Sequence, residues 1–399
     1  MKVLCYCDFG VATGFSNVAE NIIYRLAKKL PKNTYFDIIG VNYGGEKTEI
    51  NEKITLYSCM EKAMNKEDYY GRDSILRFIR EDNYDIFFAI NDLAVMSPIY
   101  PHLKLLKKQC KARGNEIKYV LYFPIDSPPH PTDIVSQDIF NTGEKTGIGI
   151  FDELITYTNY AKDEVMKVIK SHSMVDFLKM KNKIKVIPHG TDSETFHPLL
   201  PSEISDFRKE YFRISPDTFL IGQVNRNSSR KDVATSLQAY KIMLDKKTFD
   251  FPIKYYMHMN PLYHSGYDLW KVCMALGLEA KDFIFPALGF NEASGVSRET
   301  LNKIYNSFNL FFTTTTAEGW GLSIVEAMAC KIPVLVPEHT SIKEIIEPIS
   351  EPELCMDSFI DGFQVFDGEF IRHKCDPFAA AYRLEAAIAI YSKPSDEYV

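Results

Sequence analysis

The sequence predicts an α/β protein with two Rossmann-like domains, each built on a parallel β-sheet, and three observations lead to this expectation. At 399 residues, the chain is longer than one hydrophobic core usually organises, so two domains of roughly 180–200 residues each are expected. Short apolar runs alternate with amphipathic stretches, which is typical of parallel strands covered by helices on both faces. This rhythm is interrupted by a proline-containing stretch at residues 198–201 and then restarts.

The first half contains the elements of one open sheet. We expect strands and intervening helices in the following segments. The strands are Lys2–Cys7, Phe36–Val41, Asp85–Ile90, Tyr119–Phe123, Glu153–Thr156 and Ile184–Ile187, and the helices are Asn17–Leu30, Ile75–Arg80, Leu103–Arg113 and Tyr160–Ile169.

The second half repeats the pattern. Its expected strands are Phe219–Val224, Ile253–His258, Phe283–Phe285, Leu310–Phe312 and Val334–Val336. An alanine-rich segment then predicts a terminal helix, with Asp376 as its cap and Pro377 in its first turn. We therefore expect domains at residues 1–197 and 198–375, followed by a closing helix within 376–399.

Composition and charge exclude several classes of protein. A net charge of −7 argues against binding to duplex nucleic acid, which needs a clustered cationic surface. Two lysine-rich segments, 104–113 and 179–185, are expected to be solvated faces rather than docking surfaces for an anionic lipid or polymer. The cysteines have no zinc-like spacing, and the chain shows no signal peptide or membrane span. A soluble, cytoplasmic protein is expected.

A glycine-containing loop, Phe9–Ser16, follows the first expected strand. Glycine lets a backbone approach a phosphate closely, and the start of the next helix favours negative charge. Gly14 is therefore a candidate contact for a phosphorylated ligand. The spacing is not that of a dinucleotide fingerprint, and a plain strand-to-helix turn is an equally good interpretation.

A second loop, Thr313–Ala329, carries more chemical information. A strand ends in hydroxyl residues, Glu318 stands at its tip, and Gly319-Trp-Gly-Leu leads into a helix that begins near Ser323. Two acids, Glu318 and Glu326, could reach opposite ends of one ligand, with backbone amides between them for a diphosphate. The alternative for Glu326 is structural, because Ser323-x-x-Glu326 also has the pattern of a capping box.

These residues resemble a known family. Glu318-Gly-Trp-Gly-Leu-Ser-Ile-Val-Glu326 is similar to the paired-glutamate signature of retaining glycosyltransferase family 4, which has the GT-B fold. Three further segments agree in order, and together they cover about residues 185–345. They are Ile187-Pro-His-Gly-Thr-Asp192, Gly222-Gln-Val-Asn-Arg226 with Arg230-Lys231, and Leu301-Asn-Lys-Ile-Tyr305-Asn306.

The resemblance implies two Rossmann-like domains facing across a cleft, with the C-terminal helix packing back towards the N-terminal domain. It implies that Arg226 and Lys231 hold the donor diphosphate, that Glu318 binds the donor sugar and that Glu326 accepts hydrogen bonds from the ribose. The intervening amides would come from Gly319, Trp320, Gly321 and Leu322. Lys331 and His189 stand where the family usually has glycine and commonly has asparagine.

The family also implies a mechanism. It transfers sugars with retention, through front-face departure in which the leaving phosphate helps to deprotonate the acceptor, so no protein nucleophile is required. The chain has no convincing Asp-x-Asp site, and neither a metal ion nor another cofactor is expected. The base would lie near Phe283–Gly289 and be recognised by backbone, which leaves UDP and GDP donors undistinguished.

The catalytic contribution of the N-terminal half is less defined. Family members often place a histidine beside the donor sugar after the strand that corresponds to Tyr119–Phe123. Here Asp126 is the first candidate and His130 the second, while a rigid proline turn without a catalytic role is an even alternative. Asn91-Asp92, at the end of another strand, is a candidate on the acceptor side.

The predicted function is retaining transfer of a hexose-type sugar from a UDP- or GDP-linked donor to a glycan or other hydroxyl acceptor. Two alternatives remain, a non-catalytic subunit that binds a nucleotide sugar and a nucleotide-sugar epimerase on the same fold. The Phe-, Tyr- and Lys-rich composition is also reminiscent of sugar transferases of large DNA viruses. No nucleic-acid partner is expected, and peripheral membrane contact is left open.

Overall fold

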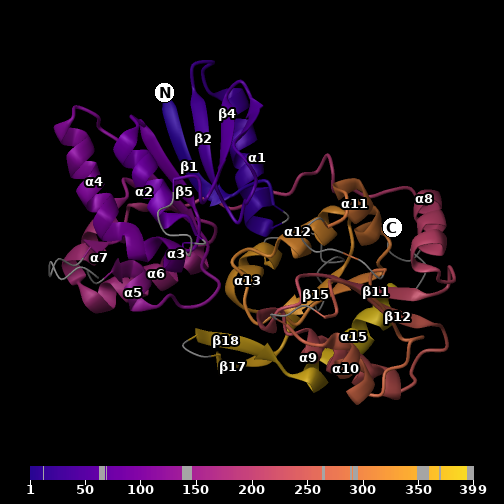
Figure 1. The fold of residues 1–399 in the computed structure, drawn as a ribbon. Helices are drawn as coiled ribbons and strands as arrows, with labels where there is room; N and C mark the ends of the chain where they lie inside the picture. The colour runs from indigo at the N-terminus through magenta and orange to yellow at the C-terminus, as the bar shows by residue number, and fades with distance from the viewer. Residues whose placement is uncertain are drawn as a thin grey trace. The chain divides into compact units, whose positions relative to one another are not determined.

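The computed structural model describes residues 1–11, 13–62, 68, 70–136, 146–262, 266–287, 290, 295–347, 359–367 and 370–392. The chain divides into two compact units, Met1–His189 and Gly190–Val399. The units are drawn from indigo to magenta and from magenta to yellow in Figure 1, and each is described by itself. The division falls slightly before the boundary expected near residue 197.

The first unit is built on an eight-stranded sheet in the order β10-β9-β6-β5-β1-β2-β4-β3. Its strands are parallel except for the antiparallel pair β3–β4. Every interior residue of strand β1, near the middle of the sheet, is buried, so helices cover both faces of the sheet, as the sequence predicts. The strands are β1 Lys2–Asp8, β2 Tyr35–Val41, β3 Thr48–Asn51, β4 Ile54–Ser58, β5 Ile86–Ile90, β6 Lys118–Phe123, β9 Glu153–Thr156 and β10 Ile184–Val186.

Hydroxyl side chains begin two of the long helices of this unit. Thr13 caps the first by accepting a hydrogen bond from the Ser16 amide, and Thr158 caps another by accepting one from the Ala161 amide. The helices are α1 Gly14–Lys29, α2 Arg72–Glu81, α3 Leu93–Met96, α4 Tyr100–Ala112, α5 Pro131–Ile134, α6 Asn159–His172 and α7 Met174–Met180, with short 3₁₀ turns η1 Ser97–Ile99 and η2 Ile148–Ile150 and a small pair β7 Val135–Ser136 and β8 Thr146–Gly147.

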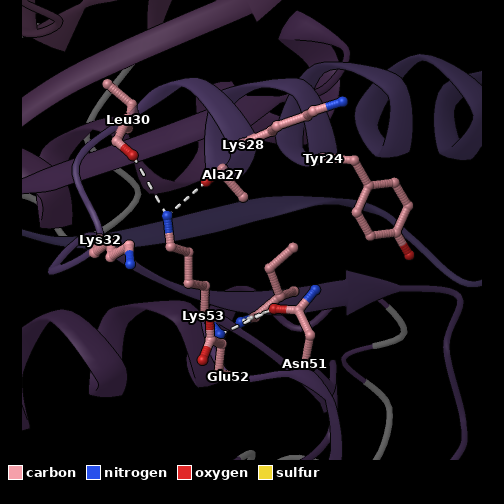
Figure 2. Close-up of a pocket in the computed structure, with 9 residues that line it drawn as sticks. Tyr24, Ala27, Lys28, Leu30, Lys32, Asn51, Glu52 and Lys53 are labelled. Carbon is pink, nitrogen blue, oxygen red and sulfur yellow. Dashed lines mark hydrogen bonds between the residues drawn. The ribbon is translucent and has the colours of Figure 1, made fainter.

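A pocket at the amino end of β4 is explained by helix capping (Figure 2). The Lys53 ammonium donates to the carbonyl oxygens of Ala27 at 2.7 Å and Leu30 at 3.3 Å, at the C-terminus of α1. A cation at this end of a helix is favourable because the last carbonyl groups carry negative partial charge. Ligands of open α/β sheets bind at the opposite, carboxyl edge, so we assign this pocket a structural role.

The second unit is built on a six-stranded sheet in the order β13-β12-β11-β14-β15-β16, with every pair parallel. Alternate strand residues enter two cores: Ile221 and Phe312 lie in one, while Leu220 and Phe311 lie in the other. Both faces are therefore buried, which confirms the second α/β domain. The strands are β11 Phe219–Val224, β12 Ile253–His258, β13 Phe283–Ile284, β14 Leu310–Phe312, β15 Val334–Pro337 and β16 Phe359–Ile360.

The helices of this unit include the predicted terminal one. Asp376 caps it by accepting from the amides of Phe378 and Ala379, and Leu384 packs into the core of its own unit. Its return towards the first unit stays a prediction, and residues 393–399 lie outside the described part. The helices are α8 Pro201–Phe207, α9 Val233–Asp245, α10 Leu269–Ala275, α11 Arg298–Asn306, α12 Leu322–Ala329, α13 Thr340–Ile346 and α15 Pro377–Tyr391, with a π-helical turn at Arg208–Phe212 and a 3₁₀ turn at Ser229–Lys231.

An antiparallel hairpin follows the sheet, formed by β17 Gly362–Asp367 and β18 Phe370–Cys375. The sequence patterns did not predict it. The His373 amide donates to the Thr316 carbonyl oxygen at 3.1 Å, so the hairpin is tied to the loop that carries Glu318. Among the described residues, no helix is both long and apolar enough to cross a membrane.

Candidate active site

The threonine run that ends β14 holds a second segment in place. The hydroxyl of Thr314 donates to the Asp232 carbonyl oxygen at 2.8 Å, and that of Thr316 donates to the Arg230 carbonyl oxygen at 3.0 Å. The Thr316 amide donates to the same Arg230 oxygen at 2.8 Å. These bonds fix the 3₁₀ turn after β11 beside the end of β14, and so determine where the side chains of Arg230 and Lys231 begin.

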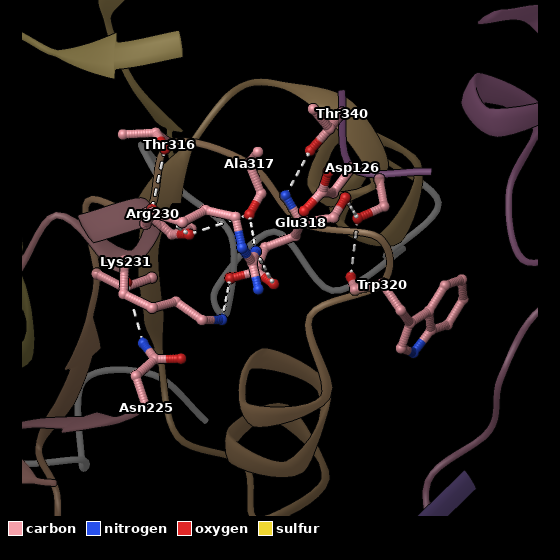
Figure 3. A network of polar contacts seen from close by, with 12 residues as sticks. Asp126, Asn225, Arg230, Lys231, Thr316, Ala317, Glu318, Trp320 and Thr340 are labelled. Atoms are coloured by element: carbon pink, nitrogen blue, oxygen red, sulfur yellow. Dashed lines mark hydrogen bonds and ion pairs between the residues drawn. The ribbon is translucent and has the colours of Figure 1, made fainter. Parts of the chain in front are cut away.

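Glu318 forms ion pairs with both Arg230 and Lys231 (Figure 3). Its carboxylate lies 2.5 Å from the Lys231 ammonium and 3.3 Å from the Arg230 guanidinium, and only 6% of the residue is exposed. Burial raises the pKa of this carboxyl, but the two cations outweigh it and lower the pKa from 4.5 to about 2. Glu318 is therefore ionised at neutral pH and anchored to cationic side chains.

A hydrogen-bonded chain holds the backbone of Glu318 from the other side. The Thr340 hydroxyl accepts from the Glu318 amide at 3.2 Å and lies 3.1 Å from Nδ1 of His339, whose Nε2 lies 2.8 Å from the Thr315 carbonyl oxygen. Because a carbonyl only accepts, Nε2 carries the proton and Nδ1 accepts from Thr340. Burial lowers the pKa of His339 to about 4, which keeps the ring neutral. Neither His339 nor Thr340 was predicted from the sequence.

The turn between Glu318 and α12 depends on glycine. Gly321 has φ of 100°, a left-handed conformation that residues with a side chain rarely adopt, and it caps α12 without a side-chain hydrogen bond. The Ser341 hydroxyl donates to the carbonyl oxygens of Glu318 at 2.8 Å and Trp320 at 3.0 Å, which holds the turn open. The first amides of a helix have no intrahelical acceptor, so this end of α12 favours an anion.

Glu326 lies within α12, and its side chain points into the protein. It is 9% exposed, and its carboxylate accepts a hydrogen bond of 2.7 Å from the Tyr305 hydroxyl. Burial raises the pKa of this carboxyl to about 7, although the Tyr305 hydrogen bond and the charge of Arg298 act in the opposite direction. The capping-box alternative is wrong, because α12 begins at Leu322 with Gly321 as its cap and leaves Ser323 inside the helix.

Lys231 and Arg226 are the cations expected to hold the donor diphosphate. Lys231 contacts Glu318 as described, but the second cation at this carboxylate is Arg230 rather than Arg226. Arg226 is exposed on the loop that follows β11. The role of Arg226 in binding a diphosphate stays a prediction.

The glycine loop of the first unit has an acidic environment. Glu20 accepts hydrogen bonds from the Gly10 amide at 3.1 Å and from the Ser16 hydroxyl at 2.8 Å, and Thr13 donates to Asp8 at 2.7 Å. Gly14 is the first residue of α1, so the helix begins three residues earlier than the expected Asn17 and takes in the end of the loop. The Glu20 carboxylate uses donors that a phosphate would need, so the role of Gly14 in donor binding stays a prediction and gains no support from this geometry.

The two candidates after β6 differ in their surroundings. His130 caps α5: its Nδ1 accepts from the Thr132 amide and lies 2.6 Å from the Thr132 hydroxyl. Asp126 is partly exposed and accepts a hydrogen bond of 3.2 Å from the Ser127 hydroxyl. His130 thus has a structural task, which favours Asp126 between the two. Asn91 is mostly buried, and its side chain accepts from the Asp92 amide.

Comparison with known proteins identifies the segment that contains Glu318 and Glu326. The family described as Glycosyl transferases group 1 matches residues 292–354. The chain carries a group 1 glycosyltransferase segment. Two curated relatives are similar to this chain over about half of its length. A probable sucrose-phosphate synthase of Thermosipho melanesiensis is 26% identical over 212 residues, which are 52% of this chain and 44% of the relative.

The second relative is the capsular polysaccharide biosynthesis glycosyltransferase CapM of Staphylococcus aureus. It is 23% identical over 212 residues, which are 52% of this chain and 48% of the relative. The matched part of the chain thus spans about half the length of these curated relatives. Neither relative supports a viral origin.

Solved structures establish the fold over nearly the whole chain. The catalytic domain of starch synthase IV from Arabidopsis thaliana, bound to ADP and acarbose, superposes with a TM-score of 0.64 at 13% identity and covers 99% of this chain and 92% of its own. Sucrose-phosphate synthase from Thermosynechococcus elongatus gives a TM-score of 0.59 at 12% identity, with 98% and 96% covered. The glycosyltransferase segment therefore belongs to a GT-B fold with two Rossmann-like units, as the resemblance implied.

Proposed function

We propose that this protein is a retaining glycosyltransferase that moves a hexose-type sugar from a UDP- or GDP-linked donor to a hydroxyl of a glycan or other acceptor. The observation that carries the proposal is the buried Glu318 carboxylate, held between Lys231 and Arg230 at the beginning of α12. Its ionised state and the helix start beside it suit a ligand that has sugar hydroxyls next to a diphosphate. The group 1 segment supports the same class of reaction.

The cations supply the electrostatic part of the proposed reaction. Negative charge builds on the leaving phosphate as the glycosidic bond breaks, and fixed cations stabilise that charge. Lys231 and Arg226 would contact the diphosphate, while Arg230 stays with Glu318. Before the donor binds, Glu318 neutralises Lys231, so the ammonium is already held in position and its placement costs little when the phosphate arrives.

The two glutamates would bind opposite ends of the donor. Glu318 accepts hydrogen bonds from sugar hydroxyls, and Glu326 accepts them from the ribose. Between them, the amides of Gly319, Trp320, Gly321 and Leu322 face the diphosphate at the positive end of α12. Each donor group thus meets a protein group of complementary charge or hydrogen-bonding type.

The proposed chemical step is front-face departure through an oxocarbenium-like transition state. The leaving phosphate takes the acceptor proton, so the protein supplies neither a nucleophile nor a metal ion. Asp126 is the proposed contribution of the first unit. These features come from the family resemblance, whereas the Glu318 site rests on the geometry of this chain.

The test combines donor binding with product analysis. Thermal shift with UDP-, GDP-, dTDP- and ADP-sugars should identify one donor class, because a ligand that binds the native state raises its stability with occupancy. NMR of the product formed from that donor should show an anomeric configuration equal to that of the donor. Binding without transfer to any acceptor in a glycan panel, or inversion at C2 of the donor when no acceptor is present, would contradict the proposal.

A further inference from the structure

A cluster of exposed apolar side chains lies on α7 of the first unit. Met174 is 53% exposed, Val175 61% and Leu178 66%. They follow one another at helical spacing and so share one face, while Phe177 and Met180 turn towards the core. Single exposed apolar residues are ordinary, but three on one short helix form a patch that suits an apolar environment.

Ser173 fixes the direction of this patch. Its amide donates to the Ile169 carbonyl oxygen at 2.9 Å and closes α6, while its hydroxyl accepts from the Asp176 amide at 3.1 Å and starts α7. The two helices thus meet at one residue, and α7 packs beside α6. The apolar face is therefore held outward by a double cap rather than displayed by a loose loop.

Lysines lie on and next to α7: Lys179 is in its last turn, Lys181 follows it, and the Lys170 ammonium of α6 lies 5.7 Å from the centre of the Phe177 ring. Lys170, Lys179 and Lys181 are all exposed, and among the described residues none of the three forms an ion pair. Lys167 and Lys185, at the margins, are paired with Glu164 and Glu153. Asp176 is the acidic residue of α7 itself, so the local charge is positive although the whole chain carries −7.

The lysine-rich segment 104–113 of α4 meets the chain that follows α7. Lys107 of α4 donates to the Ile150 carbonyl oxygen at 3.3 Å, and Lys183 donates to the Gly149 carbonyl oxygen at 2.9 Å. Both bonds end on the 3₁₀ turn η2, so α4 and the chain after α7 meet there. Lys107 is itself paired with Asp152 at 2.6 Å, so this junction fixes the chain that follows α7 but adds no unpaired charge beside the apolar face.

In place of the solvated face expected for residues 179–185, we propose that the apolar face of α7, together with Lys170, Lys179 and Lys181, docks the protein on a bilayer that contains anionic lipids. The three apolar side chains would enter the interface between headgroups and acyl chains, while the lysines remain at the level of the anionic headgroups. The charge complementarity favours this occupant over a zwitterionic bilayer, which offers no excess of negative charge to the lysines.

The test measures binding of the full chain to vesicles without donor, so its result does not depend on the proposed transfer. Wild type should co-sediment with phosphatidylcholine vesicles that contain about one third phosphatidylserine, and much less with pure phosphatidylcholine. Leu178→Glu should weaken partitioning by about tenfold or more, because burial of a leucine side chain is lost. Lys179→Glu combined with Lys181→Glu should weaken it at least as much, and high salt should do the same.

Matched controls separate this surface from general effects. Met274→Glu places the same charge on α10 of the second unit, at a residue that is 70% exposed. Lys209→Glu reverses an exposed charge on the π-helical turn Arg208–Phe212 of the same unit. Both should bind vesicles like wild type. Absence of wild-type binding to anionic vesicles, or equal binding by the α7 variants and the controls, would overturn the proposal. The proposal would also be overturned if the lysine substitutions weakened vesicle binding, Leu178→Glu did not, and soluble polyglutamate abolished binding by the wild type. That result would indicate that the surface binds a soluble polyanion.

Discussion

The Tyr305 hydroxyl donates a hydrogen bond of 2.7 Å to the Glu326 carboxylate, and both side chains are buried in the second unit. The bond joins α11 to α12 and stabilises the ionised form of an acid whose pKa burial raises to about 7. Near neutral pH, Glu326 is therefore poised between its two protonation states. A ribose hydroxyl that donates to it would favour the ionised form.

The first prediction concerns stability and pH at Glu326. The folded pKa is about 7 against an ordinary 4.5, so the native state binds more protons than the unfolded chain between these values. The free energy of unfolding should therefore fall as pH rises through this window, by roughly 3 kcal/mol in total from this group. Urea titrations at several pH values should show that Glu326→Gln removes this component. An unchanged pH profile would mean that Glu326 is not buried as described.

Glu318 should show the opposite pH dependence. Its folded pKa of about 2 lies below the ordinary 4.5, so its ion pairs stabilise the fold above pH 4.5 and are lost as pH falls towards 2. Glu318→Gln should remove that acid-sensitive contribution. It should also reduce the rate of sugar transfer by about 100-fold or more, while nucleotide affinity stays nearly unchanged. Full activity in this variant would refute the assignment of the site.

Thr340 gives a test of the hydrogen-bonded chain that positions Glu318. Thr340→Val removes the hydroxyl that accepts from the Glu318 amide and donates to His339, at similar volume. We expect a fall in kcat of about tenfold with little change in KM for the donor, because the sugar-binding carboxylate is misplaced rather than lost. Thr340→Ser should restore most of the rate. If valine and serine behave alike, the hydroxyl has no positioning role.

Gly321→Ala tests the turn before α12. The added Cβ would lie 3.1 Å from the Ile324 Cδ1 atom, and the alanine would have to adopt a φ of 100°. We expect a loss of stability of about 1–2 kcal/mol together with weaker donor binding. Gly114→Ala is the matched control, since Gly114 has φ of 80° and open space around its Cβ position. The control should lose stability without losing donor affinity, as measured by calorimetry of binding.

Much of the fold could be predicted because its signal is local. The buried strands β1, β6 and β11 are short apolar runs, and a run that is apolar on both faces indicates a parallel sheet whatever its neighbours are. The Thr313–Ala329 loop was likewise visible, since its acids and glycines are contiguous. The hairpin β17–β18 carries exposed aromatic residues such as Phe366, at 83%, and therefore lacks the alternation that reveals a half-buried strand.

The rest of the site depends on contacts that no local pattern encodes. Tyr305 reaches Glu326 from another helix, and His339 reaches Thr315 across the end of the sheet. For Ser323, the local pattern was misleading: the capping-box spacing is present, but the left-handed Gly321 caps the helix two residues earlier. The pairing of Arg230 with Glu318 could not be predicted either, because the threonine bonds that position Arg230 are long-range.

Thr316 links three distant parts of the chain: its amide and hydroxyl bind the Arg230 carbonyl oxygen, and its own carbonyl oxygen accepts from the His373 amide. Contacts of such sequence separation carry a large loop-closure cost and tend to form late in folding. During synthesis, the turn that aims Arg230 and Lys231 would gain its last tether only after β18 has left the ribosome. Full donor affinity would then be reached only once the second unit is complete. A nascent chain that ends before His373 should bind a nucleotide sugar weakly even if its sheet has formed.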